Sequence, residues 1–233
     1  MKKFLLATIV LTTSILNSCS VDGPQKPNNE SVFIYGTYSK SNNDYYILND
    51  LDKKILLKNK VKSDEYLGKR FFVVGKSTTI QNSVYDREMS ATMMQESATY
   101  KINIVESLEQ IEGLGTSGID FSSDFSYNHI YFSGKYLNFI FSIVSVNPNN
   151  HTFTYSFDKN KKEYSQNKFT IYIRQKNNNS ETPNSEKKFY PVYSSLDMTE
   201  IINKTNERRI TIVINYINMH GIEKEDIYEI TPN

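Results

Sequence analysis

The sequence contains one cysteine, Cys19, so no internal disulfide bond can form. A lone free thiol is a liability in an exported protein, and its position is therefore informative. Cys19 follows a segment that starts with Met1, Lys2 and Lys3 and is mostly apolar over residues 4–16. A positively charged start followed by a short apolar stretch is typical of a secretory signal, and the stretch is too short to span a bilayer stably.

The residues that precede Cys19 predict that its thiol carries a lipid. Leu16 lies three positions before the cysteine and Ser18 lies directly before it. These are the aliphatic and small residues that a lipoprotein signal peptidase requires. We therefore expect residues 1–18 to be a signal peptide and Cys19 to be the lipidated first residue of the mature protein. Each acyl chain contributes about 0.8 kcal/mol per buried methylene, so the membrane is an expected partner.

Neither sign of charge is in excess. The chain has 27 basic and 26 acidic residues, and loss of Lys2 and Lys3 with the signal leaves a formal charge of −1. This balance gives no electrostatic basis for binding nucleic acid. Tryptophan is absent, whereas tyrosine and phenylalanine number 17 and 13.

The common catalytic patterns are also missing. There is no Gly-x-Ser-x-Gly turn, no pair of histidines at metal-ligand spacing and no second cysteine. His129 lies near Asp124 and several serines, but acyl transfer also needs an oriented base and an oxyanion pocket. A strand or hairpin position is the simpler interpretation of His129. We expect His151 at the end of a sheet and His220 in a solvated tail.

Residues 49–52, Asn-Asp-Leu-Asp, offer acidic oxygens but lack the glycine and distal glutamate of a calcium loop. We expect a turn there. The sequence thus predicts no catalytic residue, no metal site, no cofactor and no enzymatic activity. An envelope hydrolase is retained as a third alternative, because two carboxylates paired across a cleft cannot be identified from one sequence.

The distribution of residue types predicts two β domains. Residues 19–31 are polar, contain two prolines and are expected to form a tether. From residue 32 onward, short apolar or alternating segments are separated by Asn-rich turns, as in strands. Tyr100, Ile102 and Ile104 alternate with polar residues and are expected to lie in the first domain, 32–112. Residues 113–126 contain glycines and serines and are expected to be a linker before the second domain, 127–233.

The second domain has the clearest alternation. Four sets of apolar residues each share one strand face: Leu137, Phe139, Phe141 and Ile143; Phe153, Tyr155 and Phe157; Phe169, Ile171 and Ile173; Ile210, Ile212 and Ile214. Evenly spaced strands with turn signals predict an all-β sandwich or barrel. A short helical turn is expected near residues 196–203.

Several segments, in this order, resemble the NigD-like lipoproteins of Bacteroidota. They are the tyrosine-rich strand and Asp-containing turn over 44–57, Gly68-Lys69-Arg70-Phe71-Phe72-Val73, Tyr136-Leu137-Asn138-Phe139, the strand that starts at His151, and the strand Phe169 to Arg174. Family members usually carry histidine after that arginine, whereas Gln175 follows Arg174 here. This departure puts a functional Arg-His pair in doubt.

The resemblance implies an N-terminal OB-type barrel over 32–112, a C-terminal β-sandwich over 127–233 and a location in the cell envelope. It implies no activity. We expect the outer membrane, with the surface and periplasmic faces both open, because only one acidic residue, Asp22, closely follows Cys19.

The expected function is therefore that of a lipid-anchored binding or scaffolding module whose partner is an unidentified envelope protein or glycan. The alternative is a surface glycan-binding accessory protein that uses an aromatic face of the barrel. The candidates for that face are Tyr35, Tyr38, Tyr45 and Tyr46. Because tyrosine also suits strands for purely structural reasons, we favour a structural role for these rings.

Overall fold

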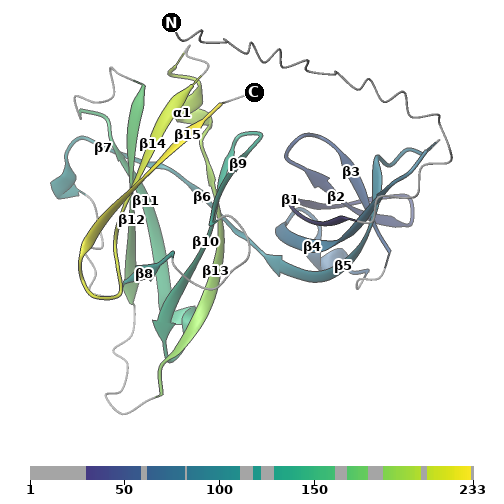
Figure 1. Cartoon of the computed structure of the whole chain (residues 1–233), viewed down its shortest axis with the longest axis horizontal. Coiled ribbons are helices and arrows are strands. Elements are labelled where there is room, and N and C mark those ends of the chain that lie inside the picture. Colours follow the sequence, from purple (N-terminus) through teal and green to yellow (C-terminus); the bar gives the residue numbers. More distant parts are fainter. Residues whose placement is uncertain are drawn as a thin grey trace, which may run out of the picture.

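The computed structural model describes residues 30–58, 62–81, 83–110, 118–121, 129–160, 167–177, 186–205 and 209–231. The predicted signal peptide, residues 1–18, and residues 19–29 of the predicted tether, which begin with Cys19, lie outside this part. The described chain is almost entirely β and forms a barrel beside a larger sandwich (Figure 1). Within the described ranges, no helix has the length and apolar character needed to cross a bilayer. The expected all-β class is confirmed.

The N-terminal domain is a closed five-stranded barrel. Its strands are β1 (Glu30–Ser41), β2 (Asp44–Asn49), β3 (Lys54–Leu57), β4 (Arg70–Thr79) and β5 (Arg87–Glu96), and the order around the barrel is β1-β2-β3-β5-β4. All neighbours are antiparallel except β3 and β5. This Greek-key barrel is of the OB type that the family resemblance implies.

Alternation along the strands builds the barrel core. Tyr38, Ile47, Val73 and Met89 point inward and are almost fully buried. Between β3 and β4, the short helical turn η1 (Asp64–Tyr66) brings Tyr66 against the rings of Tyr38 and Phe71 and covers one side of this core.

The C-terminal domain is a sandwich of two sheets. One contains β6 (Ala98–Lys101), β8 (Ile119–Asp120), β9 (Ile130–Ser133), β10 (Tyr136–Ser145) and β13 (Lys188–Asp197). The other contains β7 (Asn103–Val105), β11 (His151–Asp158), β12 (Lys168–Asn177), β14 (Ile210–Ile217) and β15 (Glu223–Ile230). The three remaining short elements are η2 (Leu108–Gln110), η3 (Pro148–Asn150) and α1 (Thr199–Ile202).

The alternating residues of the four sequence segments meet between these two sheets and form a single core. Phe139 and Phe141 of β10 face Tyr155 and Phe153 of β11, with ring centroids 5.5 and 5.1 Å apart. The short helix α1 lies within residues 196–203, and its Ile201 is buried in the same core.

The structure corrects the boundary of the barrel, which ends at Glu96 rather than at residue 112. β6 pairs with β13 of the sandwich, and β7 pairs with β11 of the opposite sheet. The chain passes from one sheet to the other at Ile102, which is buried in the sandwich core. The alternation of Tyr100, Ile102 and Ile104 therefore serves the second domain, because all three pack there.

Part of the expected linker, residues 113–126, belongs to the sandwich. Ile119 and Phe121 are buried in the sandwich core, and β8 pairs with β10. A Cβ on Gly118 would lie 2.0 Å from the carbonyl oxygen of Asn218, so this glycine permits a close backbone approach. Residues 113–117 and 122–126 lie outside the described part.

Candidate functional site

The four candidate tyrosines do not form one exposed platform. Tyr35 and Tyr38 are only 3% and 1% exposed, so these two candidates are wrong as surface rings. Tyr35 points out of the barrel toward the sandwich, and Tyr38 points into the barrel core, because the two positions differ in parity along β1. Tyr45 and Tyr46 are half-buried and point to opposite sides of β2 for the same reason.

The half-buried rings are engaged by neighbouring side chains. Tyr45 Oη donates to Asp64 at 2.8 Å, and Lys40 Nζ lies 5.0 Å from the Tyr45 ring. Tyr46 packs on Tyr85, with ring centroids 5.7 Å apart. The structural role favoured for these residues agrees with their contacts.

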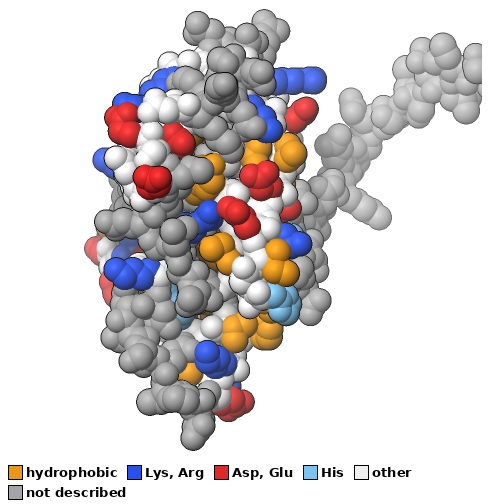
Figure 2. Space-filling model, turned by 90° about the vertical axis from the view of Figure 1, so that its left-hand side faces the viewer, with side chains coloured by type: hydrophobic (Ala, Val, Ile, Leu, Met, Phe, Trp, Pro, Cys, Tyr) orange, Lys and Arg blue, Asp and Glu red, His pale blue; other side chains and the backbone are white. Residues whose placement is uncertain are grey.

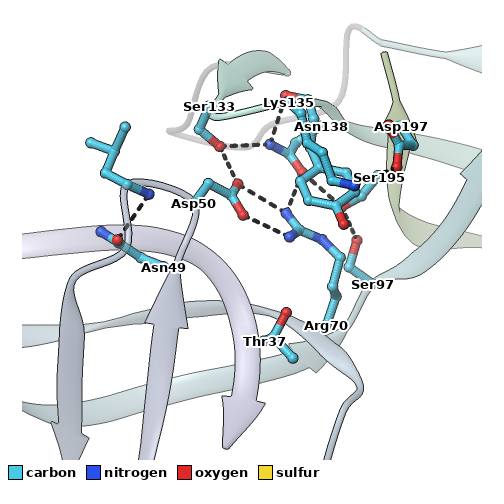
Figure 3. Close-up of polar contacts among 12 residues, drawn as sticks. Thr37, Asn49, Asp50, Arg70, Ser97, Ser133, Lys135, Asn138, Ser195 and Asp197 are labelled. Carbon is cyan, nitrogen blue, oxygen red and sulfur yellow. Dashed lines mark hydrogen bonds and ion pairs between the residues drawn. The ribbon is translucent and has the colours of Figure 1, made fainter. Parts of the chain in front are cut away.

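A polar junction joins the barrel to the sandwich (Figure 3). At its centre, Arg70 of β4 binds Asp50 of the β2–β3 turn through two nitrogens, at 2.6 and 2.9 Å. Both side chains are only 4% exposed. The guanidinium also lies over the ring of Tyr136, 3.8 Å from its centroid. A bidentate arginine–carboxylate pair is among the strongest and most directional polar contacts in proteins.

Side chains of the sandwich complete this junction. Asn138 of β10 accepts from Arg70 at 3.1 Å and from Ser195 Oγ of β13 at 2.7 Å. Ser133 binds both Asp50 and the amide nitrogen of Asn138, and Ser97 Oγ lies 2.9 Å from Ser195 Oγ. We call this set the interdomain junction: Asp50, Arg70, Ser97, Ser133, Asn138 and Ser195. The ion pair of this junction is buried and almost fully hydrogen-bonded. If the domains separated, these polar groups would lose hydrogen-bond partners, which would cost free energy.

An apolar contact continues the junction along the outer face of the barrel. Tyr35, Phe72 and Val74 of the barrel pack with Ile140 and Tyr193 of the sandwich. The Phe72 and Tyr193 rings are stacked, with centroids 5.3 Å apart. Burial raises the pKa of Tyr35 well above its usual range, with a smaller contribution from Tyr193, so its phenol stays neutral. Polar and apolar contacts together hold the two domains as one body.

A hollow opens in the barrel wall next to this junction. It has a volume of about 370 Å³ and is lined by Val32, Phe33, Ile34, Asn49, Lys53, Ile55, Ser77, Thr79, Asp86 and Arg87. Asn49 directly precedes Asp50, and the Phe33 ring contacts Tyr131 of the sandwich. We call this feature the barrel hollow.

Comparison with solved structures shows which fold this is. A NigD-like immunity protein from Bacteroides caccae superposes with a TM-score of 0.56 and 16% identity, over 89% of this chain and 99% of that chain. The chain has the NigD-like fold. A protein of unknown function from Bacteroides vulgatus gives a TM-score of 0.61 at 15% identity, over 86% of this chain and 91% of that one. A putative lipoprotein from Bacteroides fragilis gives 0.58 at 11% identity, over 88% and 99%.

At these identities the similarity concerns the fold alone. No protein-family model matches the chain, and no curated protein sequence is significantly similar to it.

The motifs that suggested the NigD-like fold meet in space. The Asp-containing turn supplies Asp50, the Gly-Lys-Arg strand supplies Arg70, and the Tyr-Leu-Asn strand supplies Asn138. No pattern in the sequence indicates the three serines of the interdomain junction, because serine is frequent and each binds at least one residue that is more than fifty positions away in the chain. The residues of these motifs thus hold the NigD-like fold together at the domain boundary.

Arg174, which ends the last of these motifs, and Gln175, which follows it, lie on opposite sides of β12. Arg174 points to the outer face of β12 and binds Asn215 Oδ1 at 2.7 Å and Glu223 at 3.3 Å. Gln175 points inward, and its amide nitrogen lies 2.5 Å from His151 Nδ1. His151 Nε2 in turn lies 2.8 Å from Ser145 Oγ. Because successive side chains alternate, a histidine at position 175 would not face Arg174 either.

The other histidines lie apart from the interdomain junction. His129 precedes β9, its carbonyl accepts from Ile140 at 2.8 Å, and its buried Nδ1 has no partner among the described residues. Asp124 lies outside the described part. His220 is exposed in the β14–β15 turn rather than in a tail. Among the described residues, no three His, Cys, Asp or Glu side chains cluster as metal ligands.

The sandwich face that lies away from the barrel carries mixed charges. Basic and acidic side chains alternate there with apolar ones (Figure 2). The described part of this face therefore shows no continuous patch of one sign that would favour a strongly charged partner.

Proposed function

We propose that the chain is a lipid-anchored protein of the cell envelope that acts as a binding or scaffolding module without catalytic activity. Cys19 carries the anchor, and residues 20–29 connect it to the barrel. The secretory signal and the Leu16 and Ser18 positions support export and lipidation. A putative lipoprotein from Bacteroides fragilis has a similar fold, which supports a location in the cell envelope. The outer membrane is the proposed location.

The interdomain junction carries the binding proposal. The hydrogen bond from Arg70 of the barrel to Asn138 of the sandwich and the stacked Phe72 and Tyr193 rings fix the two domains relative to each other. A rigid surface loses little conformational entropy when it binds a partner, which favours affinity. A neighbour with this fold is described as a NigD-like immunity protein.

The proposal is tested by capture from the native envelope. The intact lipoprotein is isolated in detergent under conditions that preserve complexes, and captured species are identified by mass spectrometry. Binding of each candidate is then measured again with purified components. An Arg70→Leu variant, which loosens the interdomain junction, serves as the control and should bind the same partner more weakly.

Three outcomes separate the candidate functions. A purified envelope protein that binds saturably supports the proposal. Saturable binding of a purified glycan to the same chain would favour the glycan-binding alternative, for which Tyr45 and Tyr46 are then the rings to replace. Turnover of an envelope polymer by the purified protein would contradict the non-catalytic role and point to the hydrolase.

A further inference from the structure

The barrel hollow exists because β1 is longer than its partner. Pairing of β1 with β2 stops at Gly36 and Asn49, whereas pairing with β4 continues to Glu30. Residues 30–35 therefore have a strand on one side only, and the barrel wall is open on the other. The β2–β3 turn borders this opening through Asn49 and Lys53. The volume of about 370 Å³ lies near the lower end for small-molecule pockets, roughly 300–1,000 Å³.

A buried hydroxyl in the barrel hollow lacks a partner. Ser77 of β4 is 1% exposed, and its Oγ makes no hydrogen bond to any part of the chain that the structure describes. Ser77 pairs with Met89 of β5, whose side chain lies in the barrel core, so Ser77 also points inward. A buried hydroxyl without a partner costs about 1–3 kcal/mol, and most buried polar groups avoid this cost. Such a group in the wall of a hollow indicates a position where a ligand atom would complete the hydrogen bond.

The barrel hollow also contains an unpaired cation. Arg87 begins β5, lines the hollow and is half-buried, and among the described residues no hydrogen bond or ion pair engages its guanidinium. The neighbouring acid is already satisfied: Asp86 accepts from the backbone nitrogen of Lys54 at 2.8 Å and lies 3.5 Å from Lys53 Nζ. Among the described lining residues, two are basic and one is acidic, which leaves a positive balance.

We propose that the barrel hollow binds a small carboxylate with an apolar body. Arg87 pairs with the carboxylate, Ser77 donates its hydroxyl hydrogen, and Val32, Ile34 and Ile55 contact the apolar part. This inference deepens the proposed binding function and names the ligand class of one surface. A guanidinium matches the two oxygens of a carboxylate in a planar bidentate pair, and the apolar wall favours a hydrocarbon body over a bare inorganic anion.

The test uses the mature chain with Cys19→Ser, residues 19–233, and two pairs of probes. Isovalerate and phenylacetate carry the carboxylate, whereas isovaleramide and phenylacetamide have nearly the same shape without the charge. Binding is followed by amide chemical shifts in NMR titrations up to about 50 mM, where even millimolar dissociation constants are visible. The two carboxylates should shift the backbone amide resonances of residues 32–34, 77–79 and 86–87. Isovaleramide and phenylacetamide should bind about tenfold more weakly or worse.

Two variants separate a ligand site from a structural role. Arg87→Gln should weaken carboxylate binding about tenfold or more, whereas Arg209→Gln, an exposed arginine outside the hollow, should leave it unchanged. Ser77→Ala should weaken binding while leaving the free energy of unfolding equal or higher, because the unpartnered hydroxyl is removed. A serine that only supports the fold would show the opposite pattern.

Equal binding of the charged and neutral probes, or no shifts with either carboxylate, would overturn the assignment. So would a Ser77→Ala variant that is destabilised and binds normally. Failure of the carboxylate site is distinguishable from failure of the proposed function. If an envelope partner binds the unsubstituted and Arg87→Gln chains equally, the binding role stands and only the carboxylate site is rejected.

Discussion

Arg70 of the barrel and Asn138 of the sandwich are 68 residues apart in the chain, yet Arg70 Nη2 donates to Asn138 Oδ1 at 3.1 Å. The same guanidinium holds Asp50 within the barrel. One side chain therefore connects the fold of the first domain to the position of the second. The contact brings together motif residues from three separate segments of this chain.

Loss of Arg70 should be far more costly than loss of an exposed cation. Arg70→Leu leaves Asp50 buried without its counter-ion, so the free energy of unfolding should fall by about 3–5 kcal/mol. Lys58→Leu is the matched control, because Lys58 pairs with Glu88 at the same distance, 2.6 Å, but the two side chains are 50% and 29% exposed. That variant should lose less than about 1 kcal/mol. Urea denaturation measures both, and similar losses would contradict the structural importance of the interdomain junction.

The turn at Gly134 should not tolerate a side chain. Gly134 has φ +56°, and a Cβ there would lie 2.4 Å from the carbonyl oxygen of Asp50. Gly68 has φ +79°, and a Cβ there would have no other heavy atom within 4 Å. Gly68→Ala should therefore lower the free energy of unfolding only by the cost of the left-handed backbone, about 1–2 kcal/mol. Gly134→Ala should cost about 2 kcal/mol more, because the β2–β3 turn must move. Equal losses of unfolding free energy in the two variants would show that the domains approach less closely than described.

Asp197 should contribute stability that disappears in acid. Burial by itself raises its pKa, but hydrogen bonds from Lys135 and from the hydroxyl and backbone nitrogen of Thr199 outweigh this and hold the pKa below its usual range. A depressed folded-state pKa gives stability above the unfolded-state pKa, near 4, which is lost as the pH falls through the folded value.

Asp197→Asn should therefore lose about 1 kcal/mol of unfolding free energy at pH 7, and this difference from the unsubstituted chain should shrink as the pH falls below about 4. Unfolding is measured by urea denaturation across this range. A difference that stays constant with pH would show that the carboxylate charge is not what stabilises the start of α1.

The sequence predicted the fold where local alternation coincides with a single core. Phe139, Phe141, Ile171 and Ile212 were placed on inward strand faces, and all four are buried in the sandwich. Alternation also identified the strand near Tyr100, but it cannot say which core a face joins. That is why residues 98–105 were assigned to the barrel, although they pair with both sheets of the sandwich.

The polar features were harder to predict, because their partners are distant in the chain. Asp50 and Arg70 belong to separate motifs, and no local rule pairs a turn residue with a strand residue twenty positions later. Ser77 and Arg87 had no sequence signal, since only the register between β4 and β5 turns both into the barrel hollow. Tyr35 and Tyr38 show the same limit, because their chemistry is identical and only parity separates their environments.

Replacement of Cys19, the proposed lipidation site, should move the protein from the membrane to a soluble fraction. Cys19→Ser removes the thiol that we propose receives diacylglycerol, and the described residues contain no helix that could cross a bilayer in its place. The unsubstituted protein should partition into the detergent phase of Triton X-114 and incorporate labelled fatty acid, whereas the variant should do neither. Asn17→Ala keeps Leu16, Ser18 and Cys19 and should behave like the unsubstituted protein. A Cys19→Ser chain that still partitions fully into detergent would mean that another part of the molecule holds the membrane.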